Sequence, residues 1–328
     1  MRRRDILGFA GGAVASVSFK ALAQTPTKAS YRIGLLSNNP WTDRNTLAFW
    51  GAYKSELTRL GWVEGRTVAF ELASSDGAYN RLPAVAQELV GRKVDLITVA
   101  GGLAATAVRD ATKSIPVVFI VGDDPVTIGL VGSLARPGGN LTGVAAMSME
   151  LIAKRLELLL GVARGAKLIA LLTTGTFGTA TARIDEETGR IASTLGLQWL
   201  AVQAAREEEL ASAIDKHHHV DGWFVSDTIL TFTRELVPSV FARQSKPVVY
   251  PNSTFVRAGG LLSYGANTFA QARRAAWYVN RILRGTNPSE LPVEQPTQVE
   301  LVVNLGTARG QGISIPPSVL QRADEVIE

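Results

Sequence analysis

The 328-residue sequence contains no cysteine and only three histidines. The absence of cysteine excludes disulfides, thiolate metal sites, a cysteine nucleophile and a lipidated N-terminal cysteine. The histidines are consecutive, His217-His218-His219, and precede an apolar run at 220–225, so they lie at the amino end of a predicted strand. They fit a solvated loop better than a metal site, because adjacent histidines rarely converge on one ion. Without a histidine beside a candidate nucleophile, a Ser-His-Asp triad is not expected.

Sequence fingerprints of nucleotide cofactors are also missing. The nearest candidate, Gly175-x-x-Gly178, is a glycine-containing turn that lacks the full G-x-G-x-x-G pattern, and no G-x-x-x-x-G-K-[ST] segment occurs. Outside the N-terminus, no stretch approaches the roughly 18 uninterrupted apolar residues of a membrane-spanning helix. The sequence therefore predicts no cofactor, no metal site and no enzyme, and it leaves the mature chain without a membrane anchor.

The N-terminus is typical of an export signal. Arg2, Arg3 and Arg4 precede a mostly apolar stretch at 6–19, and Ala21-Leu22-Ala23 forms a cleavage site before Gln24. The segment 3–7 also fits the twin-arginine pattern, so the Sec and twin-arginine routes both stay open. Removing residues 1–23 takes away four basic residues and one acidic residue, a net of +3, so the formal charge falls from +5 to +2. We expect a periplasmic protein with no affinity for nucleic acid.

A repeated hexapeptide indicates the fold. SIPVVF at 114–119 returns as SKPVVY at 245–250, and each is preceded by an apolar run that begins with Val-Asp, at 94–99 and 220–225. Further upstream, the predicted strand at 31–37 matches the one at 167–173. The order strand, helix, strand, helix, strand, helix, strand thus occurs twice. We predict an α/β fold of two doubly wound parallel-sheet lobes, with a hinge and an interlobe cleft.

Ligands of open parallel sheets bind beyond the carboxyl ends of the strands. In this chain those positions are polar and rich in glycine, with two aromatic residues and no histidine or lysine. Donors, acceptors, carboxylates and flat apolar faces together suit the binding of a zwitterion or a polar aromatic molecule rather than covalent chemistry. The predicted ligand-binding residues are Ser37, Asn38, Gly101, Gly102, Asp123, Asp124, Thr174, Phe177, Asp227, Thr228, Asn252 and Tyr264.

We assign expected roles within this set. The Gly101-Gly102 pair precedes a helix, where backbone N–H groups either bind a carboxylate or only form a tight turn. Of Asp123 and Asp124, one is expected to cap a helix at 126–134 and the other to face a cation. In the leading hypothesis, Asp124 or Asp227 would hold an ammonium or hydroxyl group of the ligand. Ser37 or Thr174 would assist with the carboxylate. Tyr264 and Phe177 would flank the apolar part of the ligand.

Several segments resemble a known family. They include Ile-Pro-Val-Val-Phe at 115–119, Arg-Pro-Gly-Gly-Asn at 136–140, Ala-Gly-Gly-Leu-Leu-Ser-Tyr-Gly at 258–265 and Pro-Val-Glu-Gln-Pro at 292–296. With them, essentially the whole mature chain resembles the TrpX-like substrate-binding proteins of ABC transporters. The resemblance implies the type I periplasmic binding protein fold, whose lobes close around a small molecule that is then offered to a membrane permease. Some members of this family bind aromatic amino acids.

The chain departs from the family inside the predicted pocket. Members often carry Asn-Pro after the fifth strand, where this chain has Thr-Thr-Gly-Thr-Phe-Gly at 173–178, and an apolar-proline pair where it has Ser-Asp-Thr at 226–228. The ligand therefore cannot be copied from a relative. The resemblance also implies three crossings, expected near Gly143, Gly265 and Glu294, with the two glycines as hinges. The expected N-terminal lobe is 30–143 with 266–293, and the C-terminal lobe is 144–265 with 294–328.

The hypothesis from the sequence is a solute receptor of an ABC importer. Its partners would be an amino acid or aromatic carboxylate and a permease in the inner membrane, and it would be a monomer, because it must open and close. The alternative is a sensor protein of the same fold that docks on a chemoreceptor or sensor kinase. An enzyme on this fold and the effector domain of a transcription factor are both disfavoured.

Overall fold

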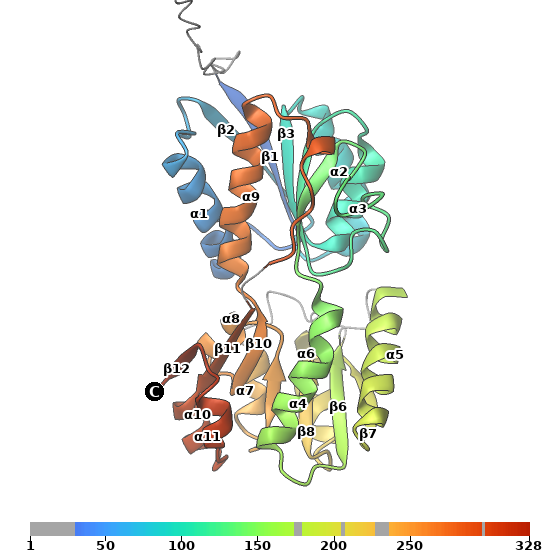
Figure 1. Ribbon diagram of the computed structural model, residues 1–328, viewed down its shortest axis with the longest axis vertical. Helices are drawn as coiled ribbons and strands as arrows, with labels where there is room; N and C mark the ends of the chain where they lie inside the picture. Colours follow the sequence, from blue (N-terminus) through green and yellow to red (C-terminus); the bar gives the residue numbers. More distant parts are fainter. Residues whose placement is uncertain (1–29, 174–178, 205–206, 227–235, 297–298) are drawn as a thin grey trace, which may run out of the picture.

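The computed structural model describes residues 30–173, 179–204, 207–226, 236–296 and 299–328. These residues form two α/β lobes that follow each other along the long axis of the molecule (Figure 1). The first sheet has the strand order β2-β1-β3-β4-β5, and the second has β12-β11-β10-β9-β8-β6-β7. The described strand pairs are parallel except β10 with β11. The prediction of two doubly wound sheets is confirmed.

The elements alternate along the chain as the two-fold repeat predicts. The first lobe contains β1 (Tyr31–Ser37), α1 (Arg44–Arg59), β2 (Val68–Ser74), η1 (Tyr79–Arg81), α2 (Leu82–Gly91), β3 (Leu96–Ala100), α3 (Gly102–Ala111), β4 (Val117–Val121), β5 (Leu141–Ala145), α9 (Thr268–Leu283) and η4 (Pro288–Glu290). The second contains η2 (Ser148–Leu151), α4 (Ile152–Val162), β6 (Leu168–Thr173), α5 (Thr179–Thr194), β7 (Gln198–Gln203), α6 (Glu207–Lys216), β8 (Gly222–Val225), α7 (Leu236–Phe241), β9 (Val248–Tyr250), α8 (Ser253–Arg257), β10 (Leu262–Ala266), β11 (Val299–Asn304), α10 (Leu305–Gly310), α11 (Pro317–Leu320) and β12 (Glu325–Ile327).

The repeated hexapeptide forms equivalent strands, β4 and β9, each the fourth strand of its lobe. The proline before each strand has no N–H, but its carbonyl already belongs to the sheet. Pro116 O accepts the Ile97 N–H at 2.9 Å, and Pro247 O accepts the Trp223 N–H at 2.9 Å. Proline is tolerated there because only the donor is lost, and this occurs at the strand start. In both lobes, a proline thus precedes a buried strand that has a neighbouring strand on each side.

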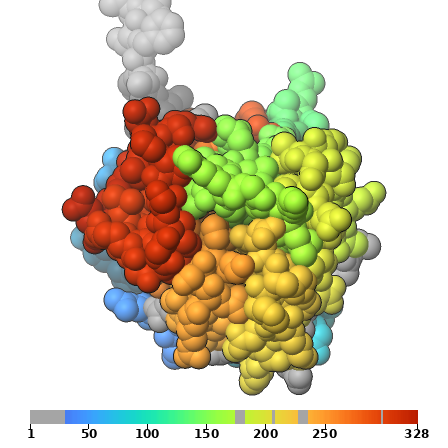
Figure 2. All heavy atoms as spheres, turned by 90° about the horizontal axis from the view of Figure 1, so that it is seen from below, coloured from blue at the N-terminus to red at the C-terminus, as the bar shows by residue number. Residues whose placement is uncertain are grey.

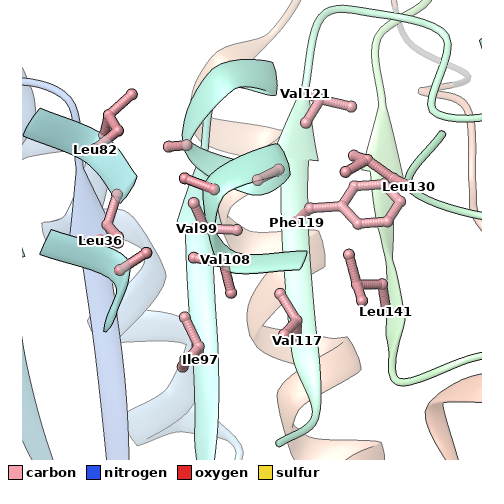
Figure 3. Packing of buried hydrophobic residues seen from close by; sticks show 14 of the residues in the cluster. Leu36, Leu82, Ile97, Val99, Val108, Val117, Phe119, Val121, Leu130 and Leu141 are labelled. Carbon is pink, nitrogen blue, oxygen red and sulfur yellow. The ribbon is translucent and has the colours of Figure 1, made fainter. Parts of the chain in front are cut away.

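Both faces of the first sheet are covered, which explains the continuous apolar strands. Val117, Phe119 and Val121 of β4 pack with α2 and α3 in one cluster (Figure 3). Val118 and Ile120 alternate to the other face, where α1 and α9 lie. Each buried side chain of this size contributes about 1.5–3 kcal/mol relative to exposure. The return of α9 to the first lobe, after β10 of the second, therefore completes a core that the N-terminal half leaves open.

The C-terminal segment covers the outer part of the second lobe. In Figure 2 the red residues of the C-terminus lie directly beside the green residues of α4. Leu156 and Leu159 of α4 share one apolar cluster with Val319 of α11, and Arg322 forms an ion pair with Glu157 at 3.4 Å. Elements more than a hundred residues apart in sequence thus complete one core. Within the described ranges, no helix is long and apolar enough to cross a membrane.

The chain passes between the lobes after β5, after β10 and before β11. Gly143 and Gly265, which the sequence suggested as hinges, lie inside β5 and β10 rather than between the sheets. A Cβ on Gly143 would stand 2.0 Å from Phe119 O, and one on Gly265 would stand 1.8 Å from Pro251 O. A neighbouring backbone thus leaves no room for a side chain at either position. The lobe boundaries drawn at these residues stay a prediction.

We expect Gly265→Ala to destabilise the second lobe strongly. The added methyl group would overlap the Pro251 carbonyl, and relieving the overlap would cost about 3 kcal/mol of the free energy of unfolding. Urea denaturation measures this change. The control is Gly51→Ala in α1, where nothing lies within 4 Å and alanine should be neutral or slightly stabilising. Equal midpoints for Gly265→Ala and wild type would contradict the close approach.

Candidate functional site

The two lobes present the carboxyl ends of their strands to each other. All strands of the first sheet are parallel, so their carboxyl ends share the edge from which the chain leaves β5 for the second lobe (Figure 1). The chain likewise leaves β10 for the first lobe from the carboxyl edge of the parallel strands β6 to β10. The residues that follow these strands therefore line the junction between the lobes. This is the place that the strand-end rule predicts for a ligand.

The structure describes eight of the twelve predicted site residues. Ser37, Asn38, Gly101, Gly102, Asp123 and Asp124 lie at the edge of the first sheet, and Asn252 and Tyr264 lie at the edge of the second. Thr174, Phe177, Asp227 and Thr228 lie outside the described residues. The geometry that follows is therefore most detailed for the first lobe.

Two polar side chains pack directly on the Gly101-Gly102 pair. A Cβ on Gly101 would stand 2.8 Å from Asn38 Nδ2, and one on Gly102 would stand 2.2 Å from Asp123 Oδ2. Gly101 has φ +98°, and its N–H donates to Ile120 O at 2.9 Å. Glycine is needed here both for this backbone conformation and for the close approach. One of the two N–H groups expected to bind a carboxylate is thus used within the protein, and a protein carboxylate already lies against the other glycine.

Asp124 caps the turn that follows β4. Its Oδ1 accepts the Val126 N–H at 2.9 Å, and its Oδ2 accepts the Thr127 hydroxyl at 2.6 Å. Burial acts to raise the pKa of Asp124, but these hydrogen bonds, together with the positive charge of Arg183, outweigh it and hold the pKa below its usual value. Asp124 is therefore the structural member of the aspartate pair, as one of the two was expected to be.

The helix predicted at 126–134 is wrong. The structure has a series of turns there, in which the Leu130 N–H donates to Pro125 O at 2.8 Å. Gly129 has φ +71°, a conformation that ends a helical turn and that glycine adopts without strain. The apolar residues Leu130 and Val131 are buried in the first core, so their spacing reflects packing of a loop rather than a helix face.

In the second lobe, Asn252 is the N-cap of α8, and its Oδ1 accepts both the N–H and the hydroxyl of Thr254. Tyr264 is half-buried on β10 and packs against the apolar cluster that includes α4. Both residues lie next to a buried cation that the sequence analysis missed. Arg155 of α4 is 1% exposed, and it donates from Nε to Tyr264 O at 2.7 Å and from Nη2 to Pro251 O at 3.2 Å.

A sequence signal for Arg155 exists. It lies three residues after Ile152 and four before Leu159, which places it on the buried stripe of an amphipathic helix. An arginine on such a stripe is almost never buried without acceptors for its five N–H groups. Arg155 joins the ends of β9 and β10 at the edge of the second sheet, so we regard it as a positioning residue of the site.

Two amide oxygens at the end of β1 lack partners. The Oδ1 atoms of Asn38 and Asn39 are buried and accept no hydrogen bond within the described part of the chain, and Asn39 is only 4% exposed. Ser37 is buried beside them, and its Oγ accepts the Asn39 N–H at 3.1 Å. Buried acceptors of this kind are uncommon in folded proteins. These two oxygens, at the edge of the first sheet, can be satisfied only by hydrogen-bond donors.

Known proteins share this architecture over most of the chain. A curated tyrosine-binding protein of Clostridioides difficile (strain R20291) is 23% identical over 292 residues, which cover 87% of this chain and 82% of the relative. A Streptococcus pneumonia domain solved in complex with L-Trp superposes with a TM-score of 0.80 at 24% identity, covering 91% of this chain and all of that one. A conserved domain protein from Vibrio cholerae gives a TM-score of 0.82 at 24% identity, with the same coverage.

Two doubly wound lobes that present their strand ends to each other define a two-lobed solute-binding protein with the type I periplasmic binding protein fold. The model of the ABC transporter substrate binding protein family matches residues 47–327. The chain belongs to that family. The family is described as substrate-binding, and the Clostridioides difficile relative is named for binding tyrosine rather than for catalysis.

We expect Asp124→Ala to lower the free energy of unfolding by about 1 kcal/mol at pH 7, as loss of a cap does. The pKa of Asp124 is lower in the folded protein than in the unfolded chain. The ionised carboxylate therefore contributes fully to the free energy of unfolding above the ordinary aspartate pKa of about 4. This contribution is lost as the pH falls through the lower pKa of the folded protein. Urea denaturation at pH 7 and near pH 3 measures both effects. Asp124→Asn is the control, since its amide oxygen still accepts from Val126. A cost for Asp124→Ala that is independent of pH would contradict the capping role of the carboxylate.

Proposed function

We propose that this protein is the receptor of an ABC importer for an amino acid with an aromatic side chain. The observation that carries the proposal is the packing of Asp123 and Asn38 on the Gly101-Gly102 pair at the edge of the first lobe. Its support is the family membership, together with relatives named for binding tyrosine and L-Trp. The export signal predicted at 1–23 supports a location in the periplasm, and the family membership supports a permease in the inner membrane as its partner.

The first lobe would recognise the ammonium group of the ligand. The carboxylate of Asp123 supplies negative charge, and the unpartnered oxygens of Asn38 and Asn39 supply acceptors. An α-ammonium carries three N–H donors, and hydrogen bonds between charged groups are about twice as strong as neutral ones. An unpaired buried acceptor destabilises the protein by roughly 1–3 kcal/mol. A ligand donor that pairs with it removes this penalty and so makes the free energy of binding more favourable. Asp123 would thus take the role for which the sequence analysis offered Asp124 or Asp227.

The rest of the ligand would face the second lobe. The negative charge of Asp123 beside Gly102 repels a carboxylate, so the ligand carboxylate turns to the hydroxyl donors predicted across the junction, Thr174 and Thr228. Phe177 and Tyr264 flank the aromatic ring, where stacked or edge-to-face geometry favours flat groups. Closure of the lobes would then enclose the ligand, and the closed monomer would dock on the permease.

Binding is tested by thermal melting of the mature chain from Gln24, unfolded and refolded first to remove any bound compound. L-tyrosine and L-tryptophan at 100 times the dissociation constant should add about 2.7 kcal/mol and raise Tm by a few degrees. Sugars and 3-(4-hydroxyphenyl)propionate, which lacks the ammonium, should leave Tm unchanged. A rise with sugars alone would contradict the proposed ligand class.

We expect Asp123→Asn to weaken binding of the same amino acids by roughly 10- to 100-fold, because it removes a charge-assisted hydrogen bond worth about 1.5–3 kcal/mol. Titration calorimetry measures the loss. Asp110→Asn on α3 is the matched control, since that exposed carboxylate is paired with Arg109 away from the strand ends. Equal affinities of wild type and Asp123→Asn would show that the ammonium is bound elsewhere.

A further inference from the structure

One side chain spans the junction between the lobes. Asn267 follows β10 of the second lobe and caps α9 of the first, with its Oδ1 accepting the Ala270 N–H at 2.9 Å. Its Nδ2 donates to Glu300 Oε2 at 2.9 Å. Glu300 lies on β11, opposite Gly265 in the β10–β11 pair. Asn267 therefore connects a helix that packs on the first lobe with a strand of the second.

Two polar atoms beside this connection have no hydrogen-bond partner. One is Oε1 of Glu300, the second oxygen of the same carboxylate, and the other is Nε2 of Gln271. Gln271 is 7% exposed, and its own N–H donates to Asn267 O at 3.1 Å. Helical side chains lean toward the N-terminus of their helix, so we expect the Gln271 amide to be directed toward Asn267. The buried donor thus belongs to a residue one turn after Asn267, and the buried acceptor belongs to the carboxylate that Asn267 contacts.

The pair points to a second arrangement of the lobes. Both atoms are buried and have no hydrogen-bond partner in the described part of the chain, whereas most buried polar atoms are paired. Leaving a buried donor and a buried acceptor unpaired is unfavourable. A rotation of α9, which packs in the first core, against β11, which packs in the second, would bring them together. In the described residues, the substantial packing between helices and strands stays within each lobe, so a change in the relative orientation of the lobes would leave that packing intact.

We propose that closure of the lobes joins Gln271 Nε2 to Glu300 Oε1 in a hydrogen bond across the hinge. This hinge pair stabilises the closed state and raises affinity without touching the ligand, because apparent affinity increases with the population of the binding-competent state. The inference rests on the proposed function only in that ligand binding drives closure.

Because the chain has no cysteine, Ser55→Cys on α1 and Ser239→Cys on α7, both exposed, allow two nitroxide labels on opposite lobes. Double electron–electron resonance then gives the interlobe distance with and without L-tyrosine or L-tryptophan. Gln271→Leu removes the donor and should weaken binding about fivefold. Gln271→Glu should weaken it further and lengthen the mean distance, since two carboxylates would meet on closure.

The decisive variant is the exchange, Gln271→Glu with Glu300→Gln, which restores a donor opposite an acceptor and should restore both affinity and closure. A residue that only supports the fold would not be rescued in this way. Gln87→Leu, at an exposed position of α2, is the control and should change neither quantity.

The outcomes separate the two proposals. If wild type closes on either amino acid while Gln271→Leu and Gln271→Glu bind equally well, the hinge pair is wrong and the function stands. If wild type binds neither, the proposed function is wrong, and the hinge pair is then judged on the ligand-free distances. Loss of the short-distance population in Gln271→Glu and its return in the exchanged variant would support the pair, whereas unchanged distances would overturn it.

Discussion

Glu294 joins all three passages of the chain between the lobes, and the rest of the architecture depends on that contact. Its N–H donates to Gly143 O at 3.1 Å, and its O accepts the Ala145 N–H at 2.9 Å, which ties the last crossing to the end of β5. Its carboxylate is paired with both ends of the Arg274 guanidinium on α9, the helix that follows the β10 crossing. The guanidinium also lies 3.8 Å from the Trp277 ring centroid. These contacts therefore link the last crossing both to β5 and to the helix that follows the second crossing.

Crossings at the carboxyl edges of two sheets have a direct consequence for binding. Closure about them would move the residues after β1, β3 and β4 toward those after β9 and β10, where the polar side chains and unpartnered atoms lie. The buried groups of the hinge, Gln271 and Glu300, and those of the first-lobe edge, Asn38 and Asn39, are unsatisfied in the same arrangement. Ligand binding and closure would satisfy both sets together, so the free energy of one supports the other.

Most of the fold could be predicted from the sequence, because local sequence patterns determine its helices and strands. The repeated Pro-Val-Val strands and the apolar runs that begin with Val-Asp each depend on neighbours a few residues away. The hinge could not be predicted in this way, since Asn267 and Glu300 are 33 residues apart and their meeting depends on the antiparallel pairing of β10 with β11. Similarly, the sequence suggested Gly143 and Gly265 as hinges, whereas the structure shows that glycine is needed there because a neighbouring carbonyl, which only the folded sheet brings close, leaves no room for a side chain.

For the candidate site too, local patterns could be predicted from the sequence, whereas contacts between distant residues could not. The strand-end rule located the edges, yet it could not say which of two adjacent aspartates turns inward, because that depends on the turn closed by Leu130 and Pro125. Arg155 was overlooked because its role comes from carbonyls of β9 and β10 far along the chain.

The central claim is that the lobes close on an aromatic amino acid, and small-angle X-ray scattering of the mature protein tests it most directly. The account predicts a smaller radius of gyration at saturating L-tyrosine or L-tryptophan than without them. An unchanged radius with both amino acids would contradict it.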